Sequence, residues 1–183
     1  MRAITLFLTV ALLSAPRIVR GAEPVAQEQS ATNAPSVAKE PPVTKEQALA
    51  AIAMLETNAA SDAGVDASNT IIKFAQESHA VIVRLNPATV PWARVKAPEG
   101  QAVIRQILLA AYIGGNSKAQ LMAPQDAKDD PYDGWRLAID VYHQIRQKKP
   151  DIVIPEIDAL AQKQKTGELK RYADEIENKQ PKP

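Results

Sequence analysis

Apolar residues recur every three or four positions along most of the chain after residue 43. This is the spacing of helices that bury one face and leave the other in water. The predicted helices cover residues 44–58, 66–78, 98–113, 117–122, 131–149, 155–165 and 168–178. Because the connections between them are short, neighbouring helices are expected to run antiparallel. The pattern therefore predicts an all-α fold, a stack of antiparallel αα-hairpins with six to seven helices.

Two of the helix starts are marked by capping residues. Thr44 and Gln47 have the spacing of a capping box, in which each side chain bonds the other residue's backbone N–H. Further along, Asp129 or Asp130 can cap a helix whose first turn contains Pro131. Both starts are predicted from local chemistry alone.

Three interruptions separate the predicted helices. Residues 59–64 are interpreted as a turn, and Gly114 to Asn116 as a helix end, because glycine suits the left-handed position after a helix. Residues 79–85 (HAVIVRL) are short and β-branched, which favours a strand or an extended loop, although no partner strand is evident. Prolines keep residues 86–98 irregular. We expect one irregular or short extended segment near residues 79–98.

Part of the pattern resembles a tetratricopeptide unit. The residues that match its second helix are Ala138, Tyr142, Ile145 and Pro150. Leu108 and Tyr112 resemble its first helix, but Leu109 stands where that family has a small residue. The 34-residue period of the family is not sustained along the chain. The resemblance implies a helical-hairpin scaffold that presents a concave face to partners.

The N-terminal residues 1–22 have the order of a secretory signal peptide. Their uncharged apolar run, residues 3–13, is shorter than the roughly 20 residues of a membrane span. An uncleaved N-terminal anchor is the alternative. Residues 23–43 contain four prolines and little bulk, so we expect a disordered linker before a single helical domain at 44–178 and a frayed tail at 179–183. The protein is expected to be exported, to a periplasm by default or fully secreted.

Composition and charge exclude several classes of function. Without residues 1–21 the chain keeps 19 of its 22 basic residues against 21 acidic ones, so no basic surface for nucleic acid is expected. The chain has no cysteine, which excludes disulfides, thiol nucleophiles and iron–sulfur clusters. We expect no cofactor, and no membrane span once the signal peptide is removed.

The segment from Asp129 to Asp140 is the nearest approach to a metal-binding motif. Asp129, Asp133 and Asp140 stand at the first, fifth and twelfth places of an EF-hand loop, with Gly134 at the sixth. Pro131, however, occupies the third place, where an oxygen ligand belongs. Since the same residues make a well-capped helix, we expect the helix and no metal site.

Other catalytic patterns are incomplete. The two histidines, His79 and His143, have no acidic or histidine partner four residues on, so zinc motifs are not formed. Ser78 precedes His79 directly, which points the two side chains apart rather than into a nucleophile–base pair. Gly114 to Lys118 lacks the spacing of a phosphate-binding loop.

These observations favour a binding module over an enzyme. We expect a non-catalytic helical scaffold that binds a protein or peptide partner of the cell envelope in a groove between helices. The residues expected to anchor that partner are Trp92, Tyr112, Trp135 and Tyr142. The alternatives are a structural or stress-related envelope protein without a groove, and an enzyme using acids among Asp129, Asp130 and Asp133.

Overall fold

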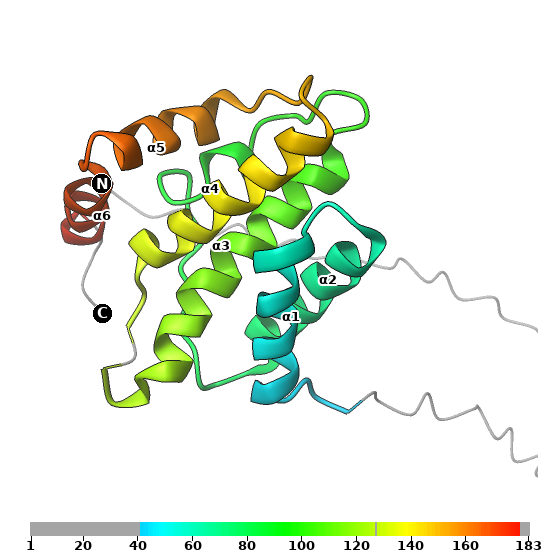
Figure 1. The fold of residues 1–183 in the computed structure, drawn as a ribbon. Helices are drawn as coiled ribbons and strands as arrows, with labels where there is room; N and C mark the ends of the chain where they lie inside the picture. Colours follow the sequence, from blue (N-terminus) through cyan, green and yellow to red (C-terminus); the bar gives the residue numbers. More distant parts are fainter. Residues whose placement is uncertain (1–40, 127, 180–183) are drawn as a thin grey trace, which may run out of the picture. The chain divides into compact units, whose positions relative to one another are not determined.

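The computed structural model describes residues 41–126 and 128–179, and within them every regular element is helical (Figure 1). The predicted all-α fold is therefore confirmed. The α-helices are α1 (Lys45–Asn58), α2 (Asp62–Glu77), α3 (Ala102–Met122), α4 (Pro131–Lys148), α5 (Pro155–Lys165) and α6 (Leu169–Asn178). Two short 3-10 turns, η1 (Pro91–Ala93) and η2 (Pro124–Asp126), lie in the connections.

Helices α3 and α4 pack along each other at the centre of the described unit. The α1–α2 hairpin covers one side of this pair, and the α5–α6 hairpin lies against α4 (Figure 1). The main core lies between these layers, where the largest fully buried side chains are those of Trp92, Trp135, Tyr112 and Tyr142. A smaller cluster of Ala48, Phe74, Val81 and Leu121 packs at one end of α1.

Both capped helix starts are confirmed. Thr44 Oγ1 accepts from the Gln47 N–H at 3.2 Å, and Gln47 Oε1 accepts from the Thr44 N–H at 2.8 Å, which completes the capping box of α1. Asp130 caps α4 by accepting from the Tyr132 N–H at 2.9 Å, with Pro131 at the first position. Helix α4 thus runs through the EF-hand places, as expected for the capped helix.

The predicted helix end at Gly114 is wrong, because α3 continues unbroken from Ala102 to Met122. A Cβ atom on Gly115 would lie under 3.0 Å from the carbonyl oxygen of Asp133 in α4. On Gly114 it would lie 3.1 Å from the Ile52 side chain of α1. The glycines therefore allow close contact between helices, and Asn116 beyond them is buried within α3.

The start predicted for the second helix is also wrong. Helix α2 begins at Asp62, because Ser61 Oγ accepts from the Gly64 N–H at 3.1 Å and caps it. A Cβ atom on Gly64 would lie under 3.0 Å from the carbonyl oxygen of Ala59. This glycine lets the chain turn tightly and re-enter a helix, so the turn is shorter than expected.

Residues 79–90 form neither helix nor strand, and side chains from elsewhere hold them in place. The Gln120 side chain of α3 bonds both backbone groups of Ile82, accepting from its N–H and donating to its carbonyl at 2.8 Å each. Asp129 Oδ1 accepts from the Arg84 N–H at 3.0 Å. The buried Asn116 amide links the two by bonding both Asp129 and Gln120, each at 2.7 Å.

The predicted signal peptide, most of the predicted linker and the end of the tail lie outside the described residues. Within residues 41–126 and 128–179, the search for membrane spans finds no helix with the length and apolarity that crossing requires.

Candidate functional site

The four aromatic residues predicted to anchor a partner are all fully buried. Trp92 packs edge-on to Tyr112, with ring centroids 6.3 Å apart. Trp135 Nε1 donates to the Thr89 carbonyl at 2.7 Å, and the Tyr142 hydroxyl accepts from the Ile154 N–H at 3.0 Å. In this conformation these rings hold the loops to the core and offer no surface to a partner.

The three acids considered for an enzymatic site have separate roles. Asp129 is buried in the network with Asn116, and burial raises the pKa of its carboxyl. Asp130 caps α4. Asp133 lies 3.6 Å from Arg136 in an exposed ion pair. Asn116 bonds the Asp129 carboxylate and the backbone N–H of Asp130, but the carboxylates of the three acids have different partners, so the structure does not bring them together as an acid–base pair.

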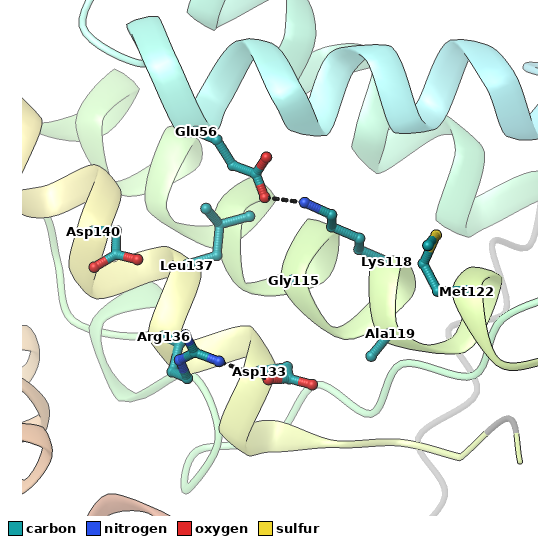
Figure 2. A pocket seen from close by; sticks show the side chains of 9 residues that line it. All are labelled: Glu56, Gly115, Lys118, Ala119, Met122, Asp133, Arg136, Leu137 and Asp140. Carbon is teal, nitrogen blue, oxygen red and sulfur yellow. Dashed lines mark hydrogen bonds and ion pairs between the residues drawn. The ribbon is translucent and has the colours of Figure 1, made fainter.

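A polar cleft of about 380 Å³ lies between α1, α3 and α4 (Figure 2). Its charged side chains are Glu56, Lys118, Asp133, Arg136 and Asp140. Glu56 and Lys118 form an ion pair across it, and Figure 2 shows Leu137 beside that pair. Gly115 forms part of its lining, at a point where α3 lies against the backbone of Asp133 in α4.

The chemistry of the polar cleft is that of solvated ion pairs. The paired side chains are each about a third exposed or more, and such pairs contribute little to stability or to selective binding. Among the described residues, Asp140 is the one charged side chain of the cleft without an ion-pair partner. Within the same residues, no group of three or more histidines and acids is placed to hold a metal ion.

A larger groove, of about 850 Å³, runs between α1 and α2. We call it the α1–α2 groove and define its floor by Ala50, Ala51 and Met54 of α1 with Ala63 and Ala67 of α2. The residues of each wall recur at helical spacing, so one face of each helix lines the groove. Small side chains on both faces leave the hollow open.

The rim of the α1–α2 groove is polar. Gln47 stands on the α1 side, and Asp66, Asn69 and Thr70 stand on the α2 side. Residues 41–43 line one end, where the Val43 N–H donates to Glu77 of α2 at 3.4 Å. The groove follows about ten residues of each helix, or roughly 15 Å at 1.5 Å per residue.

A sequence signal for this groove existed and was missed. Residues 48–55 are eight consecutive apolar residues, so α1 is apolar on every side. A helix of that kind is normally buried all round. Here Ala50, Ala53 and Met54 stay exposed, which leaves α1 with an apolar outer face.

Comparison with known proteins finds no match to this chain among family models, curated proteins or solved structures. Fold alone does not imply function, so the functional argument rests on the chemistry of these surfaces. Of the two hollows described above, the polar cleft is occupied by its own ion pairs. The α1–α2 groove is larger and has an apolar floor with a polar rim, the composition typical of binding sites.

Proposed function

We propose that the protein is an exported, non-catalytic helical scaffold of the cell envelope that binds an amphipathic helix of a protein partner in the α1–α2 groove. The observation that supports the site is the 850 Å³ apolar groove beside a helix whose outer face is also apolar. Export is supported by the signal-peptide pattern of residues 1–22.

The chemistry of the groove walls favours a helix over an extended peptide. Both walls are α-helices, whose backbone groups bond within the helix. An extended peptide would bring unpaired N–H and C=O groups to an apolar floor, and leaving them unpaired costs free energy. A helical ligand satisfies its own backbone and offers only side chains, as in other helix-in-groove complexes.

The floor residues suit close helix packing. Alanines at Ala50, Ala63 and Ala67 let a third helix approach closely, while Met54 adapts its shape to different side chains. A groove of about 15 Å accommodates roughly three helical turns. The partner is therefore expected to present apolar residues at positions i, i+4 and i+7 of one face.

The two alternatives have less support. A structural envelope protein without a groove does not explain the exposed apolar face of α1. An enzyme would need a reactive pair in a hollow, whereas the acids of the polar cleft are paired with Lys118 and Arg136 or stand alone. No observation favours a second function over the binding module.

Site-specific photocrosslinking in cells tests the proposal. A benzophenone amino acid is placed at Ala50 in the groove or, as a matched control, at Ala53, which is exposed on the same helix outside the groove. We expect a crosslinked partner from position 50 and not from position 53, with the attachment mapped to one segment of the partner.

The mapped segment is then synthesised and its binding to the intact protein is measured by fluorescence anisotropy and circular dichroism. It should become helical on binding, and Ala50→Glu should weaken it at least about tenfold, since an unpaired charge would enter the apolar floor. Ala53→Glu should leave its affinity unchanged. Equal crosslinking from both positions, or a segment that binds without helix formation, refutes the proposal.

A further inference from the structure

The backbone hydrogen bonds of residues 80–86 alternate along the chain. The N–H groups of Ile82 and Arg84 donate to side-chain oxygens of Gln120 and Asp129, and those of Ala80 and Asn86 donate locally to the hydroxyls of Ser78 and Thr89, all at 2.8–3.0 Å. Within the described part of the chain, the N–H groups between them, those of residues 81, 83 and 85, have no hydrogen-bond partner. A two-residue period of this kind is that of a β-strand with one edge bonded.

The bonded edge is supplied by side chains in place of a neighbouring strand. Gln120 pairs with both backbone groups of Ile82, and Asp129 takes the N–H of Arg84. The amide of Gln120 thereby takes the place of one peptide unit of a partner strand. On the other edge, the N–H groups of Val81, Val83 and Leu85 have no partner among the described residues. Because buried backbone groups are almost always paired, we infer that this edge is open to water.

The side chains of this segment also suit strand pairing. The sequence AVIVRL is rich in β-branched residues, which fit the pleated surface of a sheet. Val81 is buried, whereas Ile82 is 54% exposed and Leu85 is 47% exposed. Two large apolar side chains therefore stand in water beside an open backbone edge, and a partner strand would cover them.

We propose that residues 81–85 form a docking edge for β-strand addition, taking an extended segment of a protein partner with β-branched residues. The segment would bond the N–H and C=O groups of residues 81, 83 and 85, and its side chains would pack beside Ile82. This site is independent of the α1–α2 groove, and each proposal can fail without the other.

A second copy of this chain fits the edge less well. Stable dimers bury about 800 Å² per partner, and the five residues 81–85 cannot supply that area by strand pairing alone. A flexible peptide can bind through the strand edge alone, without further contact area. The expected complex is therefore a weak one, with main-chain hydrogen bonds giving most of the affinity.

Amide hydrogen exchange on the unmodified protein tests the edge directly, with a valine–threonine alternating decapeptide ended by lysines as the probe. Before the probe is added, the amides of Ile82 and Arg84 should exchange slowly and those of Val83 and Leu85 quickly. With up to about 1 mM probe, the exchange of Val83 and Leu85 should slow. The proposal is overturned if all four amides exchange alike before addition, or if the probe changes neither fast amide.

A pair of variants at Val83 separates the contribution of the backbone N–H to probe binding from that of the side chain. Val83→Pro removes the outward N–H, whereas Val83→Ala shortens the side chain and keeps the N–H. We expect Val83→Pro to weaken probe binding about tenfold and Val83→Ala to weaken it less than about threefold. Equal effects of the two Val83 variants on probe binding contradict the proposal. Loss of probe binding in Ala50→Glu also contradicts it, because the probe would then occupy the α1–α2 groove. A dimer in solution that Val83→Pro abolishes would assign the edge to a second copy instead.

Discussion

Replacing Gly115 by alanine should destabilise the protein, although alanine is the better helix former. In a helix interior the change gains about 1 kcal/mol of helix propensity. The added Cβ, however, would lie under 3.0 Å from the backbone carbonyl oxygen of Asp133, which cannot rotate away. Overpacking typically costs about 1–3 kcal/mol, and a backbone obstacle places this site at the upper end or beyond. The net loss expected is about 1–2 kcal/mol.

The neighbouring Gly114 provides the control for this prediction. Its Cβ would lie 3.1 Å from Cγ1 of Ile52, a side-chain atom that has to give way by only a few tenths of an ångström. Gly114→Ala should therefore leave stability within about 0.5 kcal/mol or raise it, because the propensity gain offsets the contact. If these glycines ended a helix instead, the destabilising substitution would be the one at the glycine in the left-handed conformation.

Thermal and urea unfolding, followed by circular dichroism, measure both variants. For a domain of this size, 1 kcal/mol shifts Tm by about 2–4 °C, so Gly115→Ala should lower Tm by about 2–8 °C. The packing argument is refuted if Gly115→Ala unfolds at the wild-type temperature, or if Gly114→Ala loses as much stability as Gly115→Ala.

Three further predictions concern hydrogen bonds seen in the structure, each checked by urea unfolding. Asp129→Asn should be neutral or stabilising at pH 7, because burial raises the pKa of this carboxyl and the amide oxygen keeps the acceptor. Because the folded-state pKa of Asp129 is raised, the free energy of unfolding of the wild type should increase relative to that of the variant as the pH falls through that pKa. An equal difference in unfolding free energy at pH 7 and pH 4 would contradict this. Tyr142→Phe should cost about 1–3 kcal/mol by leaving the buried Ile154 N–H unpaired, and a loss under 0.5 kcal/mol would show that water replaces the hydroxyl. Thr44→Ala should cost about 0.5–2 kcal/mol through loss of the cap, whereas Thr44→Ser should retain most of it.

Two helix starts that the sequence predicts correctly depend on local contacts. The capping box of Thr44 and the Asp130 cap before Pro131 involve residues two or three apart, so their chemistry can be read without knowing the fold. The helix end predicted at Gly114 and Gly115 was wrong because glycine has two structural uses. It permits a left-handed turn, and it permits close contact with another helix, which depends on a residue distant in sequence such as Asp133.

The candidate surfaces were harder to predict for a related reason. Large aromatic side chains are typical of both cores and binding sites, and only tertiary burial decides between them. Trp92 and Trp135 belong to the core. The β-branched residues 79–85 favour a strand or an extended loop, and the structure shows neither helix nor strand in this segment. Its partners, the side chains of Gln120 and Asp129, lie 38 and 45 residues from the backbone groups they bond, and no local pattern marks them.

The two proposed docking surfaces both adjoin one small cluster. Ala48 of α1, Phe74 of α2 and Val81 of the extended segment pack together there, with Val43 from the end of the groove against them. A substitution inside this cluster would disturb both surfaces at once and could not distinguish them. Ala50 and the outward N–H of Val83 lie outside it, one on each surface, and for that reason they are the positions at which the two binding modes can be tested separately.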